Sequence, residues 1–500
     1  MSHPFPLNCR APGPRANAPV AQHRRGGLVL LALAALAGCA QGPDYRRPDV
    51  EAPTQWRETY APGAVTRVDA WWRLFGDEAL DALVRDTLAG NADLRIALAR
   101  IEQYEARVQV AKAARYPQVD GIAARQRLTM SQEKPVPLPS TIAPTNNQYE
   151  AGYVASWELD LWGRVRRSNE AARADLLARR EEREAVVLTL VTEVVTGYLT
   201  LLQLDQQVAL LQREIANREA AWKSQLAKAE GGAISWVQVE TAKSVYEEKR
   251  SELPLKQHEV AVLEHQLSYL AGRAPAAIRR GRSFDALVVP GIPAGLPSEI
   301  LEQRPDIRRA EQDLVAANAR IGVARAAYFP TISLTGAAGY ASTRLANLPE
   351  LTANFWSYGI QAAGNLFDGG RISAQVAETE ARRKELVETY RRSIQAAFRE
   401  VNDALAKHRL LGDRMQAQRL QLAAAREAEV LARRRYDNGY SSYLEVLDAE
   451  KRVLQSEITQ TQSRANQLDA LVAVFRAMGG GWTGRAEQLA GLPAAAPSSK

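Results

Sequence analysis

The sequence has few cysteines and no long apolar run beyond its first 40 residues. Two cysteines in 500 residues exclude a small disulfide-stabilised fold. No stretch of about 20 consecutive apolar residues follows residue 40, which excludes a bundle of transmembrane helices. Hydrophobic residues make up 46% and charged residues 24% of the chain, which excludes a disordered protein. At roughly 100–200 residues per domain, the length alone predicts about three globular domains.

The chain also lacks a strong excess of one charge when its amino-terminal segment is left out of the count. Residues 1–38 have the pattern of a signal peptide, with Arg24 and Arg25 before an apolar stretch over 26–37. The whole chain has a net charge of +7, from 64 basic and 57 acidic residues. Cleavage would remove four arginines and no acid, which leaves 60 basic against 57 acidic residues, or +3. A nucleic-acid partner is therefore not expected.

The end of the signal peptide has a small-residue pattern before a cysteine. Leu36-Ala37-Gly38-Cys39 resembles the lipobox of bacterial lipoproteins. The resemblance implies cleavage before Cys39, N-acylation of its amino group and an S-diacylglycerol on its thiol. No aspartate follows the cysteine, and by the habit of that family this favours the outer membrane. The alternative is an ordinary signal peptide with a chance cysteine.

The remaining chain is an internal repeat. Residues match at an offset of 213 early in each copy and 207 later, as in Arg107 with Arg320 and Gly272 with Gly479. The predicted domains are a signal peptide (1–38), a lipidated segment (39–75), repeat 1 (76–272), a linker (273–297), repeat 2 (298–481) and a disordered tail (482–500).

Each repeat contains two segments in which apolar and polar residues alternate. An alternating pattern of about ten residues predicts a strand with one apolar face, as in outer-membrane barrels. A soluble sheet with two unlike faces fits the alternation equally well. The strands are expected at about 118–128, 149–161, 331–340 and 355–367.

Each repeat also contains a very long helix followed by a return helix. Residues 164–230 and 371–438 contain no proline and one glycine each, and are rich in good helix formers. Helices of this length need neighbours to coil against. Pro254 is expected to kink the first return helix. The predicted hairpins span 163–272 with a tip at 231–236, and 370–479 with a tip at 437–443.

Four strands per chain require oligomerisation if they form a barrel. The smallest membrane barrels have about eight strands, and an open edge in lipid is not viable. Two chains would supply eight strands and three would supply twelve. Strand number alone does not decide between them, whereas a tube built of many helical hairpins favours three.

Six motifs follow one another along the chain after Cys39, at 71–77, 159–164, 295–298, 304–307, 366–371, and 436–439 together with 443–449. In this order they resemble the outer-membrane efflux lipoproteins, the trimeric tunnel channels of tripartite export pumps. The resemblance implies a mostly α fold with a β-barrel part, in which three chains form a twelve-stranded outer-membrane barrel and a periplasmic α-helical tunnel. It also implies a periplasmic adaptor protein, an inner-membrane transporter of the RND type and export of small toxic compounds.

The resemblance also assigns a channel gate. The positions that match the periplasmic constriction are Tyr436, Leu444 and Asp448. Leu444 would form an apolar ring that excludes water, and Asp448 an acidic ring, with Lys451 or Arg452 as its ion-pair partner. Repeat 1 has threonine and glutamine where repeat 2 has Asp448 and Glu445, so an acidic ring would come from three positions rather than six. The alternative is ordinary packing and surface residues.

The hairpin tips are the predicted contacts for the adaptor. Gly232 and Ser235 at the first tip match Gly439 and Ser442 at the second, and small residues there permit a close backbone approach.

Three functions other than a channel are possible for such a sequence. A lipid-anchored coiled-coil scaffold without a pore would not need the strands, and a protein-secretion tunnel would use the same fold. An enzyme is not expected: the glycine-rich run over 479–484 follows a helix rather than a strand. His258, His265 and His408 lack a metal-ligand spacing, so no metal or cofactor is expected beyond the lipid on Cys39.

Overall fold

The computed structural model describes residues 40–51, 53–58, 70–131, 143–292 and 303–480. The predicted signal peptide, Cys39, the motif 295–298 and the tail lie outside these residues. The chain divides into two compact units. Each unit takes segments from both repeats, so the repeats interleave and do not fold as separate domains. The first unit consists of residues 1–44, 111–170 and 319–379, and the second of residues 45–110, 171–318 and 380–500.

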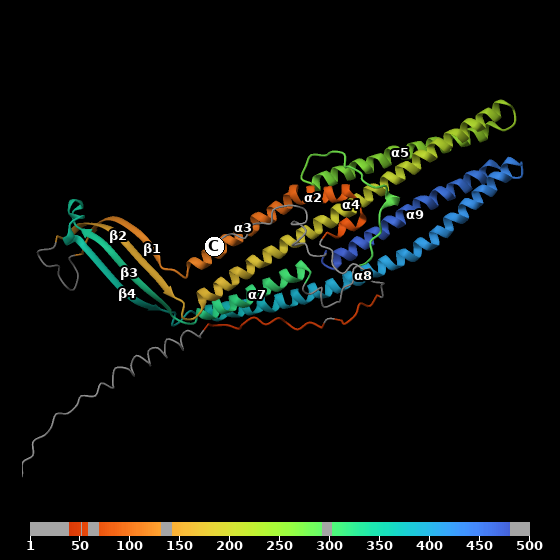
Figure 1. The fold of residues 1–500 in the computed structure, drawn as a ribbon. Helices are drawn as coiled ribbons and strands as arrows, with labels where there is room; N and C mark the ends of the chain where they lie inside the picture. The colour runs from red at the N-terminus through yellow and green to blue at the C-terminus, as the bar shows by residue number, and fades with distance from the viewer. Residues whose placement is uncertain (1–39, 52, 59–69, 132–142, 293–302, 481–500) are drawn as a thin grey trace, which may run out of the picture. The chain divides into compact units, whose positions relative to one another are not determined.

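The first unit contains a four-stranded antiparallel sheet in the order β1-β2-β3-β4 (Figure 1). The predicted strand 149–161 begins four residues earlier and ends two residues earlier in the structure. The predicted strand 355–367 is too long, because its last partner is Thr331 and the preceding Pro330 has no N–H to continue the ladder. The strands are β1 (Gln118–Thr129), β2 (Thr145–Leu159), β3 (Thr331–Ser342) and β4 (Asn354–Ala363).

The two faces of this sheet differ in character. Residues directly opposite each other in an antiparallel ladder share a face. Tyr153 lies opposite Ala338, and Ala338 lies opposite Trp356, so these aromatic residues share one face. Tyr153, Trp356 and Tyr358 are 67%, 71% and 83% exposed. A soluble sheet would bury its apolar face, so this exposure favours the barrel over the soluble alternative.

The second unit is helical, and its helices pair into two hairpins, α4 with α5 and α8 with α9 (Figure 1). Helix α2 was not predicted. Asn91 caps α3, because its Oδ1 accepts the backbone N–H groups of Asp93 and Leu94 at 2.8 and 3.1 Å. The helices are α2 (Glu78–Gly90), α3 (Ala92–Ala113), α4 (Arg164–Glu230), α5 (Trp236–Leu270), α7 (Pro305–Ala326), α8 (Arg371–Asp437) and α9 (Tyr443–Ala477), and the short 3₁₀ turns are η1 (Trp71–Phe75), η2 (Phe284–Ala286), η3 (Leu345–Asn347) and η4 (Leu351–Ala353).

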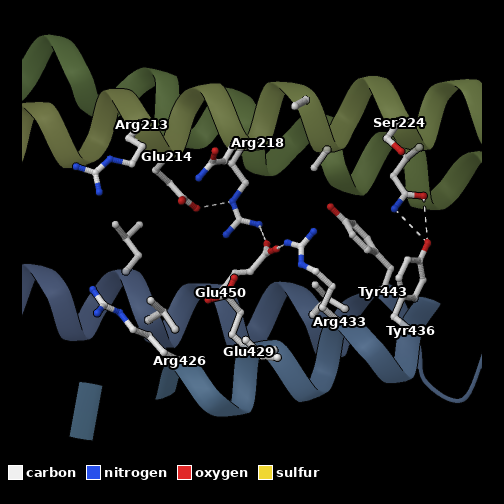
Figure 2. Close-up of a pocket in the computed structure, with 18 of the residues that line it drawn as sticks. Arg213, Glu214, Arg218, Ser224, Arg426, Glu429, Arg433, Tyr436, Tyr443 and Glu450 are labelled. Carbon is white, nitrogen blue, oxygen red and sulfur yellow. Dashed lines mark hydrogen bonds and ion pairs between the residues drawn. The ribbon is translucent and has the colours of Figure 1, made fainter. Parts of the chain in front are cut away.

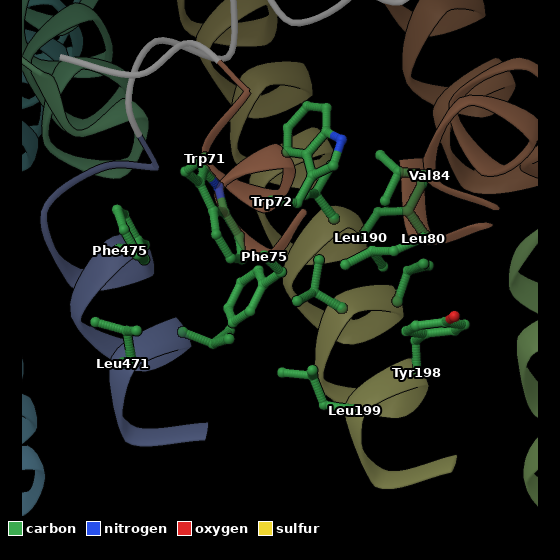
Figure 3. Packing of buried hydrophobic residues seen from close by; sticks show 14 of the residues in the cluster. Trp71, Trp72, Phe75, Leu80, Val84, Leu190, Tyr198, Leu199, Leu471 and Phe475 are labelled. Atoms are coloured by element: carbon green, nitrogen blue, oxygen red, sulfur yellow. The ribbon is translucent and has the colours of Figure 1, made fainter. Parts of the chain in front are cut away.

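A single large apolar core joins the bases of the hairpins in the second unit (Figure 3). Trp71 stacks on Phe475 of α9 with ring centroids 5.1 Å apart, and Phe75 is fully buried. One 18-residue window of α4 is apolar enough to cross a membrane, with a mean hydropathy of 1.9. However, 61% of that window is buried in the protein, as expected of a core helix.

The predicted linker between the repeats is packed against this core where the structure describes it. Ile278 and Phe284 are buried. Asp77 caps α2, and its Oδ2 also accepts the hydroxyl of Tyr198 at 3.0 Å and the backbone N–H of Arg282 at 2.8 Å. The segment is therefore a structural part of the second unit rather than a loose connection.

Candidate functional site

Both hairpins turn on a glycine with a left-handed backbone. Gly232 has φ 73° and Gly439 has φ 76°, a region that other residues rarely adopt. A Cβ added at either glycine would meet no atom within 4 Å, so the turns are open to solvent in the single chain. Ser235 caps α5 through its hydroxyl, which accepts the N–H of Val237 at 3.2 Å, whereas the hydroxyl of Ser442 makes no cap bond to α9. The four predicted tip residues thus lie at the turns.

Leu444 and Asp448 lie one helical turn apart on an exposed face of α9. The Leu444 side chain is 68% exposed, which is unusual for a leucine beside a packed hairpin. Asp448 pairs with Arg452, whose Nε and terminal nitrogen lie 3.0 and 2.9 Å from its Oδ2. The ion pair therefore forms with Arg452, the second of the two partners that the sequence suggested. Both gate candidates therefore lie on a surface that is exposed in the single chain.

Tyr436 lies apart from that face, at the contact between the hairpins. Its hydroxyl accepts a hydrogen bond from Nε2 of Gln225 on α4, at 3.2 Å. Its ring lies 5.5 Å from that of Tyr443, which is buried in a small apolar cluster with Val446 of α9 and Ala242 of α5. The three predicted gate residues thus do not converge within one chain: two face outward and one joins the hairpins.

A cavity of about 780 Å³ lies beside this contact, between the two hairpins (Figure 2). Buried Arg218 of α4 reaches across it, with Nε donating to Glu214 at 2.6 Å and a terminal nitrogen donating to Glu450 of α9. Arg433 of α8 donates to Glu450 as well. We name Glu214, Arg218, Arg433 and Glu450 the inter-hairpin charge network. It ties three helices together through one shared carboxylate.

The charges of this network perturb one another. Burial opposes the positive charge of Arg218, but Glu450 and Glu214 outweigh it and raise its pKa. Burial raises the pKa of Glu429, which also lines the cavity, and the neighbouring Glu450 and Glu214 raise it further. Glu429 therefore has a pKa above that of an ordinary glutamate.

Sequence patterns do not predict this network. A run of three arginines such as Arg433-Arg434-Arg435 is typical of a solvated helix face, yet Arg433 holds Glu450. Arg218 and Glu450 are 232 residues apart, so only the register of the two hairpins brings them together. Within the described part of the chain, no three His, Cys, Asp or Glu side chains are placed to hold a metal ion.

Comparisons with known proteins agree with this architecture. The sequence matches the family described as outer membrane efflux protein over residues 83–273 and 296–480, one segment in each repeat. It is 34% identical over 473 residues to the toluene efflux pump outer membrane protein TtgI of Pseudomonas putida, covering 91% of this chain and 98% of the relative. It is also 34% identical over 461 residues to the cation efflux system protein CusC of Escherichia coli K12, covering 89% of this chain and 97% of the relative.

The fold is similar to a solved channel of this kind. The outer-membrane channel OprN superposes with a TM-score of 0.82 at 28% identity, and the match covers 89% of this chain and 100% of that one. The family that the motifs indicated is therefore confirmed, and so are the helical fold with its small sheet and the outer-membrane location. The chain belongs to the outer membrane efflux protein family and is the outer-membrane channel component of an efflux system.

Proposed function

We propose that three copies of this chain close one twelve-stranded barrel and one periplasmic helical tunnel. The observation that carries the proposal is the sheet itself. It has four strands with an exposed aromatic face, and its edge strands β1 and β4 each have one side that pairs with no strand of the described residues. Lipid offers no partner for the backbone groups of an open edge, so the edges must pair with other copies. Twelve strands leave room for water inside, whereas eight leave a filled interior.

The hairpin tips would receive a periplasmic adaptor, which connects the tunnel to an inner-membrane transporter of the RND type. Support comes from the open turns at Gly232 and Gly439 and from the exposed side chains of Trp236 and Tyr440 beside them. The cargo would be small toxic compounds: the relatives are named for toluene and for cations, and the tunnel supplies a passive path without chemistry of its own.

Leu444 and Asp448 would form the gate, and Tyr436 would hold it in place. An exposed leucine on each of three chains gives an apolar ring that excludes water when the tips approach. Asp448 would add a ring of three carboxylates. Tyr436 would support the gate without lining it, because its hydrogen bond to Gln225 holds the repeat 2 hairpin against the repeat 1 hairpin.

The lipid on Cys39 would anchor the amino terminus in the inner leaflet of the outer membrane. A single acyl chain anchors weakly and several anchor stably, so N-acylation together with a diacylglycerol suffices without a transmembrane helix. Mass spectrometry of the mature amino terminus tests this: an unmodified Cys39, or cleavage elsewhere, contradicts it.

The assembly is tested in cells that lack the native channel. Outer-membrane fractions are run on gels with and without boiling, and accumulation of a fluorescent efflux substrate is measured. We expect a heat-modifiable trimer and lowered accumulation. A heat-insensitive monomer outside the outer membrane would favour the lipid-anchored scaffold without a pore.

A further inference from the structure

The charged residues of the sheet are separated by face. The paired register places every strand carboxylate, Asp120, Glu150 and Glu158, on the polar face. Both strand arginines, Arg125 and Arg127, lie on the opposite face. Strands β3 and β4 carry no charge. A barrel that conducts water needs its charges inside, so two arginines on the outside call for an explanation.

The face that holds the arginines is the one that contacts lipid. Arg125 lies directly opposite Tyr149, and Tyr149 lies directly opposite Ser342 of β3. The same face carries Tyr153 and Trp356, which are largely exposed in the single chain. Aromatic and apolar side chains on the outside of a barrel face the membrane, with tyrosine and tryptophan near its two interfaces.

The two arginines lie at the outer end of β1. They are four and two residues before Thr129, the last residue of the strand, or roughly 13 and 7 Å from it at about 3.3 Å per residue. The opposite end of β1 follows α3, which belongs to the periplasmic helices. An arginine in lipid is costly at the midplane and far less so near an interface. Their height therefore matches the headgroup region of the outer leaflet.

Neither guanidinium has a carboxylate partner among the residues that the structure describes. Arg125 lies over the ring of Tyr149, with its Cζ 5.7 Å from the ring centroid, which orients the group without neutralising it. Closure of the barrel would bring β4 of another copy beside β1, and β4 carries no acid over Asn354–Ala363. The neighbouring strand therefore supplies no counter-ion either.

We propose that Arg125 and Arg127 bind the phosphate groups of a phosphorylated glycolipid in the outer leaflet of the outer membrane. Arginine presents a planar set of N–H donors that matches phosphate oxygens in pairs. Tyr149, which lies beside Arg125, would contact the sugar, and the other aromatic side chains of this face would contact the acyl chains. A free phosphate ion would contact only the guanidinium groups and would leave the apolar surface without a partner. The proposal rests on the barrel and its outer-membrane location, not on the cargo.

The test uses the purified trimer in nanodiscs, with bis-phosphorylated lipid A as the probe and native mass spectrometry or thermophoresis as the readout. We expect R125Q/R127Q to bind this lipid at least about tenfold more weakly than the wild type, given the usual contribution of each basic residue near an anionic surface. D120N/E150Q, which changes charge on the polar face, is the matched control and should bind as the wild type does. Heat-modifiability confirms that each variant is a trimer.

A second comparison needs no variant. The wild type should bind dephosphorylated lipid A at least about tenfold more weakly than the phosphorylated form. Equal binding of the two lipids, or equal binding by wild type and R125Q/R127Q, overturns the proposal. Displacement of the lipid by millimolar inorganic phosphate overturns the choice of a lipid headgroup. Substrate export by R125Q/R127Q is expected to equal that of the wild type. A loss of lipid binding is thereby distinguished from a failure of the proposed channel function.

Discussion

The two repeats occupy equivalent positions in the fold but hold their hairpins together with different chemistry. Near the hairpin base, Asn91 of repeat 1 donates to the carbonyl of Leu270 at 2.8 Å. At the equivalent place in repeat 2, the buried guanidinium of Arg304 donates to the carbonyl of Ala477 at 3.0 Å and also pairs with Asp306 and Glu400. Repeat 2 thus uses a charge where repeat 1 uses a neutral amide.

The difference continues toward the tips. In repeat 1, Trp222 stacks on Tyr246 with centroids 5.7 Å apart, and Lys243 lies 6.0 Å from the Trp222 ring. At an offset of 207 residues, Trp222 and Lys243 correspond to Glu429 and Glu450. Two carboxylates at one contact repel each other, and Arg218 from repeat 1 compensates them. The second hairpin is therefore fastened to the first by an ion pair between Arg218 and Glu450. Because this contact depends on charge, the second hairpin is the better candidate for a moving part.

The largest effect is expected at Arg304. R304A removes a buried charge that three groups share, and we expect it to lower the free energy of unfolding by about 3–5 kcal/mol. N91A, the matched change in repeat 1, removes caps and should cost about 1–2 kcal/mol. Thermal loss of the helical circular dichroism signal of the trimer compares them. Equal decreases in melting temperature for R304A and N91A would contradict the difference between the two hairpin bases.

The next effect is expected in the inter-hairpin charge network. E450Q leaves buried Arg218 without one of its two carboxylates and should cost about 2–3 kcal/mol. K243Q, at the equivalent position, loses an exposed cation–π contact worth about 0.5–1 kcal/mol. Amide hydrogen exchange near the tips should rise in α8 and α9 of E450Q and stay unchanged in K243Q. Wild-type hydrogen exchange in both variants would contradict the role of the inter-hairpin charge network.

A pH dependence is expected from Asp469, whose counterpart in repeat 1 is Val262. Burial raises the pKa of Asp469 to about 6, and Lys407 offsets this only in part. The unfolded chain ionises this carboxyl near 3.8, so its charge destabilises the fold at a pH above about 6, and the penalty disappears as the pH falls toward 3.8. D469N should raise the melting temperature at pH 8 and leave it unchanged at pH 4. V262N, the control at the equivalent position, should give no pH-dependent gain.

The smallest effect is expected at the tips. S235A loses a helix cap and should cost about 0.5–1 kcal/mol, whereas S442A removes a hydroxyl that makes no cap bond and should be nearly neutral. Hydrogen exchange in the first turns of α5 and α9 measures both. A larger change in S442A would mean that the second tip is held in a way the single chain does not show.

Local sequence patterns predicted most of the helices and strands. Contacts between side chains far apart in the sequence could not be predicted from them. The predicted helix over 164–230 has the same bounds as α4 in the structure. It was predictable because helix propensity is a property of each residue and the segment contains no proline. The alternation of apolar and polar residues predicted the strands, but the end of β4 depends on Pro330, which precedes a different strand, β3. Glycine in the turns marked the tips. Arg218 with Glu450, and Arg304 with Glu400, depend on which helix faces which, and a charged residue in a long amphipathic helix looks solvated until its partner is known.

We infer that repeat 2 carries the gate and repeat 1 its frame. Single-channel conductance in planar bilayers distinguishes the two repeats, with L444S and D448A compared against V237S and T241A at the equivalent positions. Val237 is 73% exposed and Leu444 68%, so the two apolar variants are matched in exposure as well as in chemistry. We expect a raised closed-state conductance for L444S and D448A and wild-type values for V237S and T241A. Wild-type conductance in L444S and D448A, or the same rise in all four variants, would contradict it.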